Sequence, residues 1–182
     1  MRRKTFDAIL TAVGAVVVVV LLVAGGLLMW GYSFANSNVH NQLSEQQIFF
    51  PAKGSSALAS PKIGPYLNQY AGQQLLTGAQ AEAYADHFIA VHLSEMPYGG
   101  VYAKASAASQ ADPTNAKLKG EVQTIFQGTT LRGLLLEAYA FSTFAQIALL
   151  AGIASFILAF VMLILVILGW VHLRRVSPDA EL

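Results

Sequence analysis

The sequence predicts an all-α membrane protein, in which two transmembrane helices form a hairpin around an inserted helical domain. Three observations predict this fold class: two long stretches without Asp, Glu, Lys or Arg, a low overall charge, and basic residues beside both stretches. The uncharged stretches lie between Asp7 and Glu45 and between Glu137 and Arg174. Each is longer than the roughly 20 apolar residues that a helix needs to cross a bilayer. Each stretch can therefore hold one span.

The positions of the charges divide the chain into five segments. A charged side chain at mid-bilayer costs free energy, so the uncharged stretches set the limits of the spans. The predicted segments are a cytoplasmic N-terminus (residues 1–7), transmembrane helix 1 (8–31), an extracytoplasmic helical domain (32–140), transmembrane helix 2 (141–173) and a cytoplasmic C-terminus (174–182).

Composition supports this class and excludes several functions. Only 12% of the 182 residues are charged, against about 25% in ordinary soluble domains, and 55% are hydrophobic. The chain has no cysteine, which excludes disulfides, zinc ribbons and thiolate chemistry. A net charge of +1 gives no case for nucleic acid as a partner.

Basic residues predict the orientation. Arg2, Arg3 and Lys4 precede the first span, and Arg174 and Arg175 follow the second. Lys and Arg concentrate on the cytoplasmic side of short flanks. We therefore expect a multi-pass protein of the plasma membrane, with both termini cytoplasmic and the central domain outside.

The first span could instead be a cleaved signal peptide, and the second span is longer than a bilayer requires. The first apolar run is about twice the usual 7–15 residues of a signal, which favours an uncleaved anchor. No proline interrupts the sequence from Thr130 through Arg175. One long helix is expected there, with Arg132 and Glu137 on a rigid stalk above the membrane. Trp170 is expected at the inner interface.

The inserted domain is expected to be helical. A short helix should begin at Pro65 and run through Leu76. Thr77 and Gln80 have capping-box spacing, which predicts a helix from Gly78 to about Glu95. Pro97, Gly99 and Gly100 should stop that helix.

Two further helices are predicted before the stalk. The first covers Tyr102 to Gln110. The second begins at Asp112 and Pro113 and ends at Gly128, because glycine commonly follows a helix C-terminus. Its expected buried stripe consists of Leu118, Val122, Ile125 and Phe126.

His87, His92 and Glu95 are weak candidates for a metal site. Two histidines and a carboxylate are the ligands of non-haem iron oxygenases, and zinc uses them too. His87 and His92 are five residues apart, about 140° around a regular helix, so their side chains diverge. The alternative is a solvated acidic face with one interfacial histidine. No catalytic residue and no cofactor is expected.

Small residues in the second span predict a helix-packing interface. Glycine, alanine and serine at four-residue spacing let helix backbones approach closely, and an amide in lipid bonds across a helix interface. The small residues could pack the two spans against each other or against another chain, and the sequence leaves both open. The predicted interface residues are Ala148, Ala151, Gly152, Ser155, Ala159 and Gln146.

Two apolar clusters in the inserted domain are candidate docking surfaces, although either could instead belong to the domain core. They contain Ile48, Phe49 and Phe50 in one cluster, and Met96 and Tyr98 in the other.

Three blocks of sequence carry a resemblance to a known family. They are WGYSFANSNVHNQLSEQQIFFP (Trp30 to Pro51), YAGQQLLTGAQAEAYADHFIAVHLSEMPYGG (Tyr70 to Gly100) and RGLLLEAYAF (Arg132 to Phe141). The chain resembles a group of two-span membrane proteins from mycobacteria and related actinobacteria that have no settled function. Some members carry a label as aromatic ring-opening dioxygenases. The resemblance implies the two-span topology and supplies no catalytic residues.

Three functions follow as hypotheses. The first is a structural or accessory membrane protein, present as a homo-oligomer or as a small subunit of an envelope or respiratory complex. Its expected partners are the lipid bilayer and copies of itself or other membrane proteins. The second is a binding module for a lipid, quinone or other apolar ligand, with a cavity lined by Tyr84, Phe88, Leu118 and Phe126. The third is a metal-dependent enzyme that uses His87, His92 and Glu95.

Overall fold

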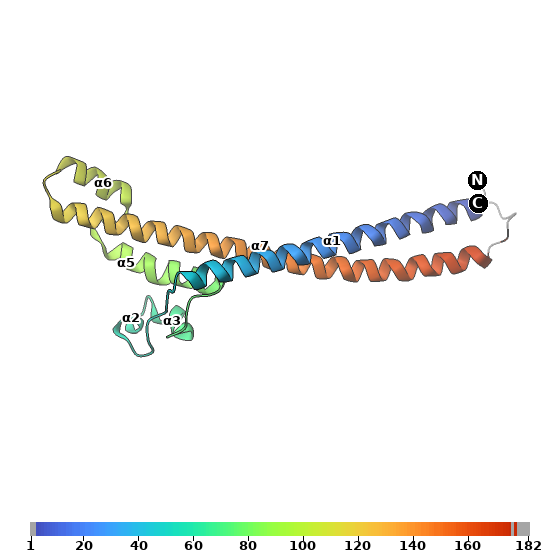
Figure 1. The fold of residues 1–182 in the computed structure, drawn as a ribbon, viewed down its shortest axis with the longest axis horizontal. Coiled ribbons are helices and arrows are strands. Elements are labelled where there is room, and N and C mark those ends of the chain that lie inside the picture. The colour runs from blue at the N-terminus through green and yellow to red at the C-terminus, as the bar shows by residue number, and fades with distance from the viewer. Residues whose placement is uncertain (1–2, 176, 178–182) are drawn as a thin grey trace. The chain divides into compact units, whose positions relative to one another are not determined.

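The computed structural model describes residues 3–175 and residue 177. Two long helices dominate it, α1 (Arg3–Glu45) and α7 (Ala116–Arg175), and shorter helices lie between them in the chain (Figure 1). Over the described residues the fold is all-helical, and one isolated β-bridge joins Phe49 and Gln74. The prediction of an all-helical fold with two long apolar helices is confirmed.

The chain divides into two compact units. Unit 1 is formed by Met1–Phe34 and Phe144–Leu182, and unit 2 by Ala35–Thr143. The predictions for Arg2 and for most of the segment after Arg175 concern residues outside the described ones.

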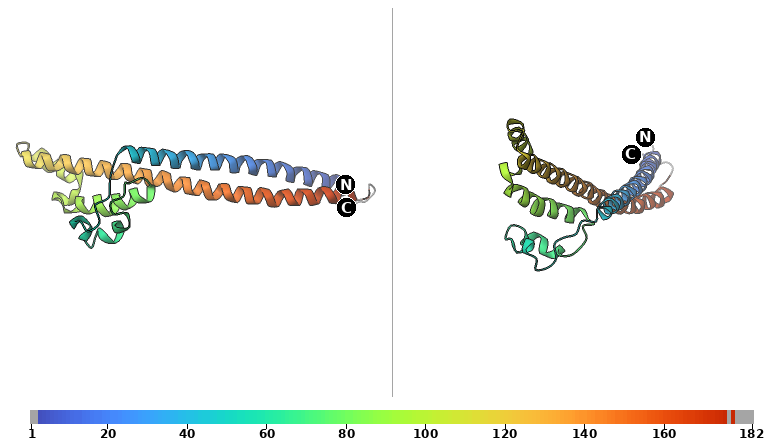
Figure 2. Two further views of the ribbon diagram at one scale, coloured as in Figure 1. Left: turned by 60° about the horizontal axis from the view of Figure 1, so that its bottom comes forward. Right: turned by 60° about the vertical axis from the view of Figure 1, so that its left-hand side comes forward.

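Unit 1 is an antiparallel pair of helices from α1 and α7 (Figure 2). Gly14 of α1 lies against Val166 of α7, and Gly25 lies against Phe156. A Cβ atom added to Gly14 would lie 2.9 Å from the Val166 Cγ2 atom, so the two helices approach closely there. We call this contact line the seam.

The seam follows a seven-residue repeat. In α7 the buried residues Ala145, Gly152 and Ala159 are seven apart. In α1 the buried residues Gly14, Val18 and Gly25 are four and seven residues apart, and both spacings occur within a seven-residue repeat. A seven-residue repeat keeps one stripe of a helix facing its partner over many turns.

Both long helices are long and apolar enough to cross a membrane. α1 extends beyond the predicted end of the first span at residue 31, because the polar segment 36–45 is also helical. The helix predicted from Thr130 to Arg175 is confirmed as part of α7, although α7 begins earlier, at Ala116.

Unit 2 also contains short elements, which follow α1 in the chain. They are α2 (Ser56–Ala59), α3 (Gly64–Leu67), the 3₁₀ helix η1 (Asn68–Tyr70), α4 (Gly78–Tyr84), the π-helical turn η2 (Ala85–Ile89), α5 (Ala90–Glu95), the 3₁₀ helix η3 (Pro97–Gly100) and α6 (Tyr102–Ala111).

The predicted capping box at the start of α4 is confirmed. The backbone N–H of Gln80 donates to the Thr77 hydroxyl at 3.3 Å, and the Gln80 side-chain oxygen accepts from the Thr77 N–H at 3.1 Å. These bonds satisfy N–H groups that have no partner inside the helix. Helical structure then continues to Glu95, as predicted, through η2 and α5.

The helix predicted from Pro65 to Leu76 is shorter than expected, since η1 ends at Tyr70. Gly72 has a positive φ of 74°, which turns the chain out of the helix. The next residues pair with an earlier segment: the N–H of Leu75 donates to the Ile48 carbonyl at 2.8 Å. Tertiary hydrogen bonds therefore replace helical ones.

The prediction that a helix ends at Gly128 is wrong, because α7 continues through it. A glycine inside a helix costs only about 1 kcal/mol relative to alanine. A Cβ at Gly128 would lie 2.9 Å from the Leu93 Cδ2 atom, so this glycine leaves room for close packing. Asn115, rather than Asp112, caps α7 by accepting a hydrogen bond from the Leu118 N–H at 3.0 Å.

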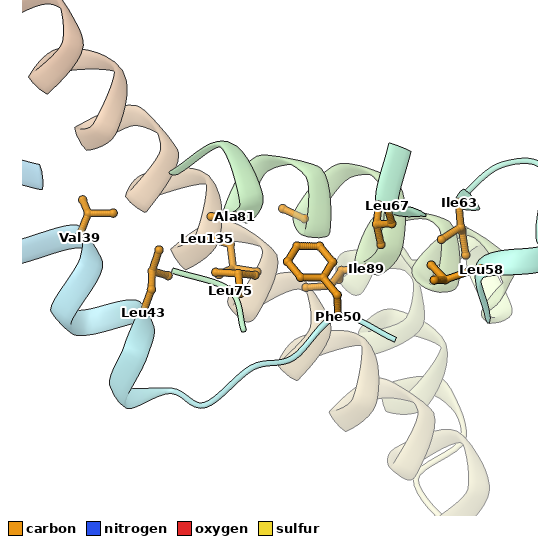
Figure 3. Packing of buried hydrophobic residues seen from close by; sticks show 11 residues of the cluster. Val39, Leu43, Phe50, Leu58, Ile63, Leu67, Leu75, Ala81, Ile89 and Leu135 are labelled. Carbon is orange, nitrogen blue, oxygen red and sulfur yellow. The ribbon is translucent and has the colours of Figure 1, made fainter. Parts of the chain in front are cut away.

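The core of unit 2 gathers side chains from α1, α2, α3, α4, η2, α7 and the segments between the short helices (Figure 3). Of the stripe predicted on the first part of α7, Leu118 and Ile125 are buried, whereas Phe126 is 48% exposed. The core residues are Val39, Leu43, Phe50, Leu58, Ile63, Leu67, Leu75, Ala81, Ala85, Ile89 and Leu135.

Candidate functional site

The helix that holds the candidate metal ligands contains a π-helical turn, η2. Such turns occur frequently at functional sites because the extra residue changes where side chains point. Asp86 of η2 accepts a hydrogen bond at 2.6 Å from Arg132 of α7, and the two side chains are 37% and 39% exposed. A pair so open to solvent contributes little net stability.

His87 and His92 have different partners. The His87 ring stacks on Tyr66, with ring centroids 3.5 Å apart and an interplanar angle of 2°. The His92 Nδ1–H donates to the Phe88 carbonyl at 2.7 Å, and its ring packs on Phe88 at 4.4 Å. Glu95 is exposed. Among the described residues no three His, Asp or Glu side chains lie close enough to hold a metal ion, so the structure does not bring this set together.

A row of five rings crosses unit 2, in the order Tyr70, Phe50, Tyr84, Phe88 and His92. Successive centroids are 5.1, 5.4, 4.8 and 4.4 Å apart, which is the range of favourable aromatic pairs. Burial raises the pKa of the Tyr84 hydroxyl.

The four residues expected to line a ligand cavity fall into two groups. Tyr84 and Phe88 pack against the core that contains Phe50. Phe126 pairs instead with Tyr102 of α6, with centroids 5.5 Å apart. These contacts place Tyr84 and Phe88 against the core and leave Phe126 48% exposed.

The first candidate docking cluster is split by its backbone. Phe50 is 3% exposed and belongs to the core, whereas the neighbouring Phe49 is 58% exposed. The Phe50 N–H donates to the Gln73 carbonyl, and this extended pairing sends successive side chains to opposite sides. Ile48 is half-buried.

The second candidate cluster belongs to a larger exposed surface, the α6–α7 patch, formed by Tyr98, Val101, Tyr102 and Phe126. Each of the four is between 43% and 48% exposed, and Met96 beside them is half-buried. Tyr98 has a φ of 60° and a ψ of 19°, a left-handed conformation that aromatic residues rarely adopt. The sequence Pro97-Tyr98-Gly99-Gly100 predicts a turn, but it does not predict the left-handed conformation of Tyr98.

The small residues predicted to form the helix-packing interface, all in α7, differ in how deeply they are buried. Gly152 and Ala159 are buried in it, and a Cβ at Gly152 would lie 3.2 Å from the Met29 sulfur. Ala148, Ala151 and Ser155 are half-buried, and the Ser155 hydroxyl donates to the Ala151 carbonyl at 2.9 Å.

Gln146 differs from these small residues because it is exposed on the surface of α7. Sequence reasoning also missed Ala145, which is 2% exposed. The seven-residue spacing between Ala145 and Gly152 is the sequence feature that could have indicated its place in the seam.

A polar cluster at one end of unit 1 was also missed. The Asp7 Oδ2 atom lies 3.7 Å from the His172 Nε2 atom and 4.0 Å from the Arg3 Nε atom. This oxygen is buried and accepts no hydrogen bond from the residues that the structure describes. A cavity of about 310 Å³ adjoins it, lined in part by Thr11 and Gly169. The sequence does place Asp7 just before the first predicted span and His172 at the end of the second, so the two residues are expected at the same end of a hairpin.

Comparisons of the chain with protein-family models, with curated proteins and with solved structures found no match.

Proposed function

We propose that the protein is a two-span protein of the plasma membrane with a structural or accessory role, which assembles through its spans and its outer domain. Both flanks of the hairpin lie in the cytoplasm, and unit 2 lies outside. It acts as a homo-oligomer or as a small subunit of a larger envelope or respiratory complex, without catalysis of its own.

One observation carries the proposal: the rest of the chain leaves most of the apolar surface of the long helices uncovered. Only 11% of the most apolar window of each long helix is buried. A core helix of a soluble protein would be mostly buried, whereas a helix in lipid exposes large apolar side chains to acyl chains. This surface is therefore suited to a bilayer and to other helices within it.

Gln146 supports assembly in particular. It lies in an apolar region of α7 and its amide is exposed. An amide in hydrocarbon gains about 0.6 to 2 kcal/mol by bonding to a polar group on another helix. The α6–α7 patch offers a second contact surface in unit 2, where four large side chains are exposed together.

The test is purification of the tagged full chain from its native membrane in mild detergent, followed by native mass spectrometry. We expect more than one copy per particle, or partners in fixed ratio. Gln146→Leu should weaken that association about 3- to 30-fold, because it loses the interhelical hydrogen bond. Ile147→Leu, which changes an exposed apolar neighbour, should leave it unchanged. A protein that is monomeric and without partners at every concentration would refute the proposal.

A further inference from the structure

A groove runs along the seam at the same end of unit 1 as Asp7 and His172. Its volume is about 390 Å³. Ala8, Ala12 and Ala15 form the α1 wall, so this wall is low and apolar. Thr11 of α1 and Val166, Ile167, Trp170 and Leu173 of α7 line the rest of the groove. A groove of this kind accepts a flexible hydrocarbon chain.

A guanidinium group lies at the rim of the groove. The Arg174 Cζ atom is 3.6 Å from the centroid of the Trp170 ring, and Trp170 itself lines the groove. Stacking occupies the flat face of the guanidinium and leaves its N–H donors free at the edge. Those donors form a fork that matches two oxygens of a phosphate group.

Among the residues that the structure describes, the charges at this end of unit 1 favour an anion. Arg175 and Lys4 are both exposed at this end of unit 1. Asp7 faces the other cavity, where it contacts Arg3 and His172. The groove therefore combines an apolar slot with a basic rim, and this combination fits a molecule with a hydrocarbon chain and a negative head.

We propose that this groove binds an anionic phospholipid of the cytoplasmic leaflet. One acyl chain lies between the alanines of α1 and Trp170, and the phosphate accepts hydrogen bonds from Arg174. The leaflet assignment rests on the proposed function, since it requires this end of the hairpin to face the cytoplasm.

Native mass spectrometry of the full chain in detergent tests the site. The probes are phosphatidylglycerol and phosphatidylcholine with identical acyl chains. We expect the wild-type protein to retain phosphatidylglycerol at least about tenfold more strongly, because only this lipid has a net negative head. Equal retention of the two lipids would overturn the proposal.

Variants separate the two parts of the site. Arg174→Gln should abolish the preference for phosphatidylglycerol, and Arg174→Lys should keep only part of it, because an ammonium group lacks the planar fork. Ala12→Phe should fill the groove and reduce binding of both lipids, whereas Ala154→Phe, at an exposed position elsewhere on unit 1, should not. Circular dichroism confirms that each variant keeps its helices. An Arg174→Gln protein with unchanged preference, or an Ala12→Phe protein that binds like Ala154→Phe, would refute the site.

The site and the proposed function can fail separately. Lipid binding is measured on single chains in detergent, so a lack of assembly does not affect it. The leaflet is tested in intact cells with Ser177→Cys, a unique thiol that an impermeant reagent should not label. Labelling from outside would place the groove in the outer leaflet and refute the cytoplasmic assignment.

Discussion

The two units differ in the size of the side chains that they bury. The largest fully buried side chains, Leu43, Leu67, Leu75, Ile125 and Leu135, all lie in unit 2. Among the described residues of unit 1 the buried positions are Gly14, Val18, Gly25, Ala145, Gly152 and Ala159, five of which are glycine or alanine. Water drives large apolar side chains into a core, whereas lipid does not distinguish them from acyl chains. The two units thus pack differently, and the small buried residues of unit 1 are those expected of helices that pack in lipid.

The close contact of the two helices in unit 1 can be tested with a disulfide across the seam. A Cβ at Gly169 would lie 3.7 Å from the Thr11 Cβ atom, within the range of about 3.5–4.5 Å found in disulfides. The chain has no other cysteine, so Thr11→Cys with Gly169→Cys should form one intramolecular disulfide on oxidation. Mobility on a non-reducing gel measures it.

Thr11→Cys with Ala154→Cys is the control pair and should stay reduced in single chains. If both pairs behaved alike, the helices of unit 1 would not be held in the observed register.

The next largest effect concerns the core of unit 2. Leu135→Ala should lower the free energy of unfolding of this unit by about 2–5 kcal/mol, because it leaves a cavity where the side chain is fully buried. Hydrogen exchange of the segment 78–95 in detergent measures the loss. Leu134→Ala, at a position 52% exposed, should change it by less than about 0.5 kcal/mol. Equal losses would mean that the core does not depend on Leu135.

In unit 1 we expect the largest loss of stability when a large side chain replaces a buried glycine of the seam. Gly152→Leu should destabilise the hairpin by about 1–3 kcal/mol, since Met29 lies directly against this position. Fluorescence of the two tryptophans, Trp30 and Trp170, both in unit 1, follows thermal unfolding in detergent. Ala154→Leu adds bulk at an exposed site and should be neutral. A neutral Gly152→Leu would contradict the close approach of the helices.

The smallest expected effect is a loss of stability of unit 2 at alkaline pH. Burial raises the pKa of Tyr84 above its ordinary value near 10. Above that value the unfolded chain loses the phenolic proton while the folded one keeps it, so stability should fall as pH rises from about 10 to the folded pKa. Below pH 10 there should be no effect. Hydrogen exchange of unit 2 measures the loss, and Tyr84→Phe should reduce it. An unchanged alkaline loss in Tyr84→Phe would show that other groups cause it.

Features set by neighbouring residues could be predicted from the sequence. The uncharged stretches gave the two long helices, and Thr77 with Gln80 gave the start of α4. The stop at Pro97 also followed from local chemistry.

Features set by distant residues could not be predicted. α7 continues through Gly128, where Leu93 packs closely, and Asp86 meets Arg132 across 46 positions of sequence. The partners of His87 and His92 depend on where α3 and the π turn place aromatic rings. The sequence predicted a helix-packing interface with a four-residue spacing, whereas the buried residues of the seam in α7 are seven residues apart.

The seven-residue repeat also limits how the hairpin can change in length. Adding seven residues to each long helix at matching points of the seam would lengthen it by about 10.5 Å and leave every buried glycine and alanine in register. Adding any number of residues that is not close to a multiple of 3.5 would rotate one helix and bring large side chains into the narrow contact. Hairpins of this design should therefore fit membranes of different thickness only in discrete steps.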